Sequence, residues 1–304
     1  MVKKILLFAL CVYYNASAQS SFIDYAPFYP IGEDSNIRLM TSYTKQESIL
    51  FEANPMVRFS VYNNFVHGLM NNYSHAQAWY ISIRSQIRMY SENSLPIKTP
   101  SYRAFLGTQH LFRLFPDNPS YKIEHFLGFS LESGHYSNGQ TGCAFSADYD
   151  DKTAGCDSIY SLINPSTNLS EMLNRRNGNF STNLTELVIN YRKYFLDVNN
   201  IPQVMHSLSL GLVLYHDKIF GIGNIGGYSA NDIKIYGRYR YSLGYEYLRV
   251  LGDGAMGRFS FKQNIELIKG AHKFVNPVRC ESTFTYYPFI SSESLGFFIS
   301  YVFG

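Results

Sequence analysis

A histidine and a serine two residues apart give the strongest chemical signal in the sequence, in the stretch 135–139, which reads HYSNG. If Ile123 to Asn138 is a strand, its side chains alternate between two faces, so His135 and Ser137 share the end of a mostly apolar face. A serine becomes a nucleophile when a histidine takes its proton, and that histidine needs a third group to fix its ring. The spacing therefore predicts acyl transfer, and the Gly139 backbone N–H is placed to stabilise the oxyanion.

Asn183 is the predicted third group, because it opens the next candidate strand. Antiparallel pairing of the two strands brings Asn183 beside His135 on the same apolar face. Its amide can accept a hydrogen bond from the imidazole, and a neutral group avoids the cost of desolvating a carboxylate near lipid. The competing interpretation is that Ser-Asn-Gly marks only a turn. H-x-S alone carries little weight, and the facing asparagine is what favours catalysis.

Eleven segments with alternating polarity are candidate strands, and the polar face of several of them holds Arg, Lys and Glu. They span Ile37–Thr44, Arg58–Leu69, Ala78–Tyr90, Tyr102–Phe115, Ile123–Asn138, Asn183–Phe195, Val204–Tyr215, Ile233–Arg249, Arg258–Glu266, Val278–Tyr287 and Leu295–Phe303. The recurrence of charge favours an all-β fold, an antiparallel transmembrane β-barrel with a charged lumen, over a soluble sheet. Long connections belong outside and short turns in the periplasm, which places the HYSNG stretch at the outer rim, facing lipid.

The first 18 residues predict export. Lys3 and Lys4 precede an apolar run, and Ala-Ser-Ala ends at Ala18, so the mature chain would span Gln19–Gly304. No later stretch has 18 apolar residues, which predicts no transmembrane helix. These two features leave a soluble exported protein or a barrel, and the barrel pattern favours the outer membrane of a Gram-negative bacterium. Net charge is only +3, without a basic cluster, and this argues against a nucleic-acid partner.

Cys143 and Cys156 lie close together within a polar stretch, and export makes a disulfide between them the favoured interpretation. A metal site is the alternative, because Asp148, Asp150 and Asp151 lie between the two cysteines. No histidine lies in that stretch, which counts against the metal.

The chain resembles the outer membrane phospholipase A family. HYSNG matches the family's H-x-S-N-G, and Ser181-Thr182-Asn183 matches the S-x-N that opens its next strand. Weaker similarity covers 22–29, 91–103, 232–239 and 281–289. The resemblance implies a twelve-stranded barrel that hydrolyses the acyl esters of phospholipids, with Ser137 as nucleophile, His135 as base and Asn183 as the orienting residue.

The resemblance also implies Ca²⁺ near the oxyanion hole, at the interface of a homodimer that is the active form. By position, the candidate calcium oxygens are the Gln140 carbonyl, one near Asn179 and one from Ser94. Ordinary loop polarity explains the same three residues equally well.

Two features depart from the family. The family's loop between motif and asparagine is short, whereas this chain has a long extracellular loop at 140–180. The last segment, from Leu295, resembles the family's penultimate strand, so we expect the final strand to be missing through C-terminal truncation. Two alternatives stay open: a lipid A deacylase, which shares an H-x-S-N core, and a non-catalytic barrel acting as a pore or surface-binding protein.

Overall fold

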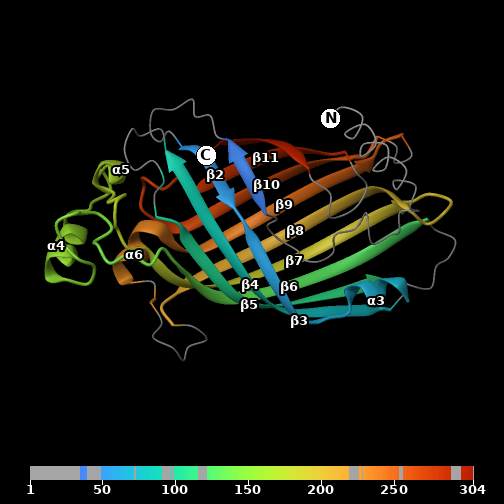
Figure 1. Ribbon diagram of the computed structural model, residues 1–304, viewed down its shortest axis with the longest axis horizontal. Helices are drawn as coiled ribbons and strands as arrows, with labels where there is room; N and C mark the ends of the chain where they lie inside the picture. Colours follow the sequence, from blue (N-terminus) through green and yellow to red (C-terminus); the bar gives the residue numbers. More distant parts are fainter. Residues whose placement is uncertain are drawn as a thin grey trace, which may run out of the picture.

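The computed structural model describes residues 35–39, 49–71, 73–90, 97, 99–115, 122–218, 226–227, 229–252, 256–288 and 296–303. The predicted signal segment and Ser94 lie outside these residues. Figure 1 shows a protein built mainly of long strands, with short helices at both ends of the sheet. The strands are β1 Asn36–Leu39, β2 Ile49–Asn54, β3 Met56–Asn63, β4 His75–Tyr90, β5 Ser101–Leu114, β6 Ile123–Ser137, β7 Ser181–Leu196, β8 Pro202–His216, β9 Gly237–Val250, β10 Arg258–Ala271, β11 Val278–Tyr287 and β12 Phe297–Phe303. The helices are α3 Phe65–Met70, α4 Ala154–Leu162, α5 Leu169–Met172 and α6 Ala230–Tyr236.

All twelve described strands belong to one antiparallel sheet, in which the strands from β4 to β12 pair with their chain neighbours and β1 pairs with β2. β2 and β3 together occupy one position in this order, since both pair with β4. Pro55 separates them, because proline has no N–H to donate to the ladder. The sheet therefore has eleven positions, in agreement with the eleven segments predicted from alternation.

The two faces of the sheet differ in chemistry, as β4 illustrates. Trp79, Ile81 and Ile83 are 39–49% exposed, whereas the alternating Tyr80, Ser82 and Arg84 are buried. We call the face of Trp79 the outer face and the face of Arg84 the inner face. The inner face carries ion pairs between neighbouring strands, including Arg84–Glu132, Arg88–Glu52 and Arg113–Glu124. An apolar outer face and a charged inner face are the pattern predicted from the sequence.

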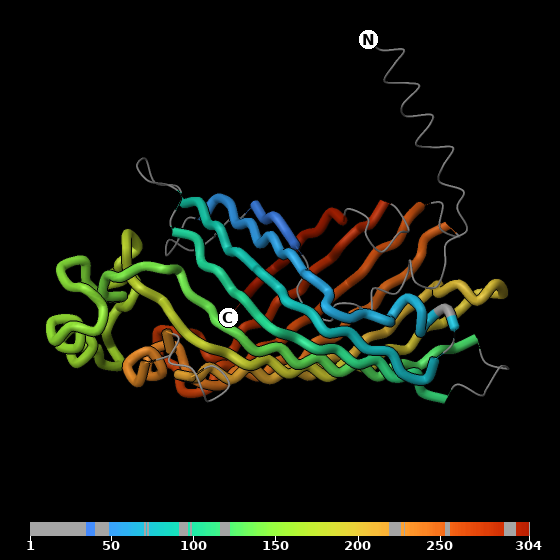
Figure 2. The backbone as a smooth tube through the Cα atoms, turned by 60° about the horizontal axis from the view of Figure 1, so that its bottom comes forward, coloured from blue at the N-terminus to red at the C-terminus, as the bar shows by residue number. Residues whose placement is uncertain are grey.

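The sheet curls so strongly that its two ends face each other. Figure 2 shows the strands arranged around a trough. Arg38 of β1 forms an ion pair with Glu281 of β11, with a separation of 3.2 Å, and its guanidinium lies 5.7 Å from the ring centre of Phe298 on β12. In the described residues, no backbone pairing joins β1 to β12. The two ends of the sheet thus meet through side chains and not through a hydrogen-bonded ladder.

Two predicted strands had wrong boundaries, and two elements were missed. The segment predicted as a strand from Ile233 begins with helix α6, and β9 starts at Gly237. The segment predicted as a strand from Arg58 to Leu69 is divided between β3 and helix α3. β2 and α4 were not predicted at all. Within the described part of the chain, no helix is long and apolar enough to cross a membrane.

Candidate active site

The structure brings the predicted histidine and asparagine together. In the antiparallel register of β6 and β7, His135 lies directly opposite Asn183 and Ser137 opposite Ser181. All four residues are on the outer face, at the end of the strands from which the 140–180 loop departs. Nδ1 of His135 lies 2.9 Å from Oδ1 of Asn183.

A second contact fixes the orientation of the Asn183 amide. Its Nδ2 donates to the backbone carbonyl of Asp217, at 3.0 Å, just beyond the end of β8. Because Nδ2 points to a carbonyl, Oδ1 must face the ring, so His135 donates from Nδ1. The tautomer selected in this way leaves Nε2 as the basic nitrogen. Asn183 is fully buried, which protects both bonds from water.

Ser137 is half-buried and lies two residues from His135 on the same face, about 6.7 Å along the strand by the usual rise per residue. No hydrogen bond among the described residues joins Ser137 Oγ to the His135 ring. The predicted nucleophile and the predicted base are thus neighbours without a mutual hydrogen bond, and long or missing hydrogen bonds are common in catalytic sites without substrate. A change of side-chain rotamer is the movement that would bring them into contact.

Asn138 holds the turn that follows Ser137. Its Nδ2 donates to the Gly178 carbonyl at 2.7 Å, and its Oδ1 accepts from the backbone N–H of Phe180 at 3.0 Å and of Gln140 at 3.2 Å. These bonds tie the start of the long loop to its end. Gly139 follows with φ of +66°, a conformation that favours glycine, and is exposed. The sequence placed Asn138 in the motif but gave no sign of this role.

Two glycines from the β8–β9 connection cover the His135–Asn183 pair. A Cβ added to Gly226 would lie 2.4 Å from Ser181 Oγ and 3.1 Å from Cε1 of His135. A Cβ added to Gly227 would lie 2.0 Å from the Asp217 carbonyl oxygen, the acceptor of the Asn183 amide. The close approach explains why small residues stand here. The sequence is rich in glycine over 221–227, but only the fold shows what Gly226 and Gly227 touch.

The predicted calcium oxygens are only partly placed. Gln140 follows the motif directly, and Asn179 lies near it, because its backbone N–H donates to Gly142 at 2.7 Å. The Asn179 side chain, however, donates to Asp151 Oδ2 at 2.7 Å within the loop. Ser94 lies outside the described residues. Those residues contain no group of three or more His, Cys, Asp and Glu able to hold a metal. Because the predicted ligands are backbone carbonyl, serine and asparagine oxygens, the calcium site stays a prediction.

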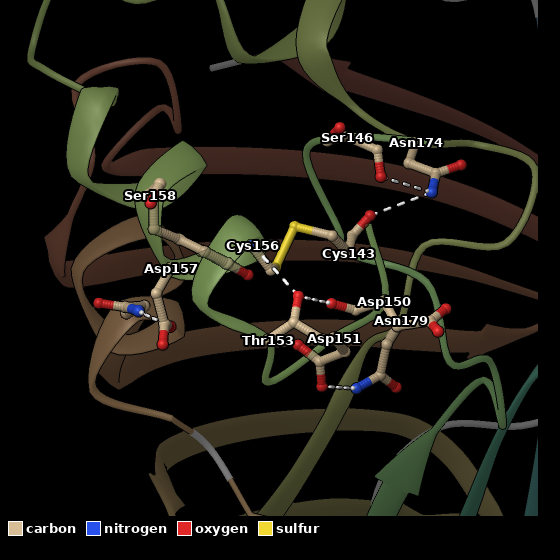
Figure 3. Close-up of a disulfide and its surroundings, with 12 residues drawn as sticks. Cys143, Ser146, Asp150, Asp151, Thr153, Cys156, Asp157, Ser158, Asn174 and Asn179 are labelled. Atoms are coloured by element: carbon tan, nitrogen blue, oxygen red, sulfur yellow. Dashed lines mark hydrogen bonds between the residues drawn. A yellow bond between two sulfur atoms is a disulfide. The ribbon is translucent and has the colours of Figure 1, made fainter. Parts of the chain in front are cut away.

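The 140–180 loop is an ordered subdomain at this end of the sheet. Cys143 and Cys156 form a disulfide at its centre, shown in Figure 3, with Cα atoms 5.6 Å apart. The Thr153 side chain caps α4 by accepting from the Cys156 N–H at 3.3 Å. Asn174 donates to the Cys143 carbonyl at 3.0 Å, which holds the returning segment against the first. The disulfide predicted from the sequence is thus present and cross-links the loop.

This subdomain packs on α6. Phe145, Leu169 and Ile235 form a shared buried cluster. The Tyr160 hydroxyl donates to Asp232 at 2.8 Å, so the contact also has a part-buried polar hydrogen bond. Burial raises the pKa of the Asp232 carboxyl above its ordinary value. Burial, followed by the charge of Asp232, raises the pKa of Tyr160. The rim of the candidate site is therefore built from the loop, α6 and the β8–β9 glycines.

No protein-family model, curated protein or solved structure matches the chain. The geometry of the site is therefore the support for a function.

Proposed function

We propose that the chain is an outer membrane hydrolase that cleaves acyl esters of phospholipids. The observation that carries the proposal is the hydrogen bond from His135 to Asn183, on the outer face of the sheet and next to Ser137. A histidine oriented by a buried amide and placed two residues from a serine supplies the three groups that nucleophilic ester cleavage uses. A turn signal alone would not need a buried asparagine aligned with the imidazole.

The membrane part of the proposal rests on the sheet. An apolar outer face and a charged inner face are the pattern of an outer membrane barrel. The contact of Arg38 with β11 and β12 brings the ends of the sheet together. An open sheet edge is costly in lipid, so we propose that the sheet closes into a barrel in the membrane. Ser137 and His135 would then face lipid at the outer rim.

The proposed reaction proceeds in two acyl transfers. Ser137 Oγ attacks the ester carbonyl carbon while Nε2 of His135 takes its proton, and Asn183 stabilises the imidazolium through Nδ1. The exposed N–H of Gly139 is the proposed donor to the oxyanion. The proton passes from His135 to the leaving lysophospholipid oxygen. Water, activated in the same way, then releases the fatty acid from Ser137.

Calcium dependence and dimerisation belong to the proposal as expectations from the family resemblance. Calcium would supply positive charge beside the oxyanion. No step of the mechanism above needs it.

The test is hydrolysis of phospholipid by the mature chain refolded in detergent, with calcium or with a chelator. The Ser137→Ala variant should lose on the order of a thousandfold or more in kcat. Ser181→Ala is the matched control, because Ser181 is the serine directly opposite on the same face, and it should remain active. Equal circular dichroism spectra establish equal folding.

Activity that survives in the Ser137→Ala variant would refute the assigned nucleophile. A well-folded protein with no hydrolysis would instead indicate a non-catalytic barrel. Release of acyl chains from lipid A, but not from phospholipid, would indicate a deacylase.

A further inference from the structure

A row of cationic and titratable side chains crosses the outer face at the end of the strands opposite Ser137. His125 on β6 lies directly beside Lys193 on β7, which lies directly beside His206 on β8. We call these three residues the imidazole–lysine row. Arg249 on β9 points to the same face and is exposed. The candidate active site uses none of these residues.

The imidazoles of the row are held by phenols. Nδ1 of His125 lies 2.7 Å from the Tyr191 hydroxyl, and Nδ1 of His206 lies 2.8 Å from the Tyr245 hydroxyl. In the described residues, no protein group bonds to the Nε2 atom of either imidazole. The two Nε2 atoms are therefore held in position and can form hydrogen bonds with a ligand.

Lys193 contributes a positive charge without a carboxylate partner in the described part of the chain. Its ammonium lies 4.8 Å from the ring centre of Phe195. Among the described residues, the nearby acidic groups are engaged elsewhere. Glu124 pairs with Arg113 on the inner face, and Asp197 accepts from the backbone of its own turn. Glu246 lies opposite Ser207 on the inner face. In the described part of the chain, the outer face at this row is therefore positive.

The position of the row matches the second surface of a bilayer. His125 precedes Ser137 by 12 residues on one strand, which is about 40 Å along the strand and about 30 Å along the membrane normal at the usual tilt. The hydrocarbon core of a bilayer is also about 30 Å thick. Between the two sites the outer face is apolar, with Leu131, Ile189 and Leu208 exposed. If Ser137 lies at the outer interface, the row lies at the inner one.

We propose that the imidazole–lysine row binds the phosphate groups of anionic phospholipids in the leaflet facing the periplasm. A phospholipid offers a phosphate for Lys193 and the two Nε2 atoms, and acyl chains for the apolar strip beside them. The proposal rests on the membrane barrel of the proposed function, but not on catalysis.

The chain offers a local reporter for the test. Its single tryptophan, Trp79, can be moved to the row by combining Trp79→Phe with Phe195→Trp, since Phe195 contacts both Lys193 and His206. The protein also carries Ser137→Ala, so that no lipid is hydrolysed. It is refolded into vesicles in which brominated phosphatidylglycerol or brominated phosphatidylcholine quenches the tryptophan. The ratio of their quenching constants measures local preference for the anionic lipid.

We expect preference for phosphatidylglycerol, and a loss of about fivefold in that preference when Lys193→Met is added. Lys262→Met is the matched control: it removes the same charge from the inner face of β10 and should leave the ratio unchanged. Equal quenching by the two lipids in the parent protein, or an equal effect of both lysine variants, would overturn the proposal.

Two further outcomes identify the source of a failure. Inorganic phosphate that displaces phosphatidylglycerol, at matched ionic strength, would assign the row to free phosphate and overturn the lipid assignment. No quenching by either lipid would show that this face does not contact lipid, which overturns the row and the barrel together. Loss of catalysis alone cannot affect this measurement, because the serine is already replaced.

Discussion

Replacement of Asn183 by alanine tests the central contact of the proposed site. The amide of Asn183 connects Nδ1 of His135, at 2.9 Å, to the carbonyl of Asp217, at 3.0 Å. During attack by Ser137 the imidazole becomes charged, and a hydrogen bond to a charged group contributes about 1.5–3 kcal/mol. Its loss should lower kcat by about 10- to 150-fold. KM should change little, since Asn183 is buried and the interaction strengthens mainly in the transition state.

The same substitution should also cost stability, because it leaves a partner of a buried amide unsatisfied, at about 1–3 kcal/mol. Asn190→Ala provides the control for this effect. Asn190 is equally buried on the same strand, but it faces the inner side and bonds to Ser207 and Ser209. It should lose stability and keep kcat. Asn183→Asp retains an acceptor for Nδ1 and should be more active than Asn183→Ala.

The assay is the initial rate of fatty acid release from mixed micelles, with kcat and KM measured separately and folding followed by circular dichroism. If folded Asn183→Ala keeps kcat within about twofold, Asn183 does not position the base. If Asn190→Ala lowers kcat as much as Asn183→Ala does, the loss reflects general destabilisation of β7. Either result would refute the reasoning.

Three other changes follow from the rim of the site. Gly226→Val should lower hydrolysis, because its side chain would collide with Ser181 and His135; Gly244→Ala, where the nearest atom is 3.5 Å away, should be neutral in the same rate assay. Replacing Cys143 and Cys156 by serine should destabilise the loop by about 3 kcal/mol and make it sensitive to limited proteolysis, while circular dichroism shows unchanged strand content. Resistance to proteolysis equal to that of the parent protein would contradict a stabilising role for the disulfide. The raised pKa of Asp232 means that its neutral form favours docking, so contact between the loop and α6 should be strongest in acid and weaken as the pH rises through that pKa. Hydrogen exchange over 154–163 should show this trend and lose it in Asp232→Asn.

Alternation predicted most of the sheet because one face is apolar and the other charged over nearly every strand. Prediction from alternation failed where a short apolar run is compatible with both the period of a strand and the period of a helix. Ile233 and Ile235 alternate as in a strand, yet they belong to α6. A local signal was present, since Ser229 caps this helix by accepting from the Asp232 N–H and also donates to the Asp232 carboxylate. Helix α4 likewise begins at a capping residue, Thr153.

The pairing of His135 with Asn183 was predictable because it needs only strand direction and the period of two. The contacts that complete the site were not. The carbonyl of Asp217 and the backbone of Gly226 reach the pair from the β8–β9 connection. Contacts made by backbone atoms do not depend on a particular side chain, so the sequence does not indicate them. The same limit applies to Asn138, whose partners are the backbone groups of Gly178 and Phe180.

The bridge made by Arg38 has a consequence for the order of assembly. Every backbone pairing in the sheet joins strands that are consecutive or, for β2 and β4, separated by one short strand, so the sheet can grow strand by strand along the chain. Arg38 and Glu281 are 243 residues apart, and closing a loop of that length in the unfolded chain costs about 5 kcal/mol from the length term alone. Once the intervening hairpins have formed, the curled sheet already holds these residues near each other. We therefore expect the contact between Arg38 and Glu281 to form last in folding and to open first when the protein is stressed.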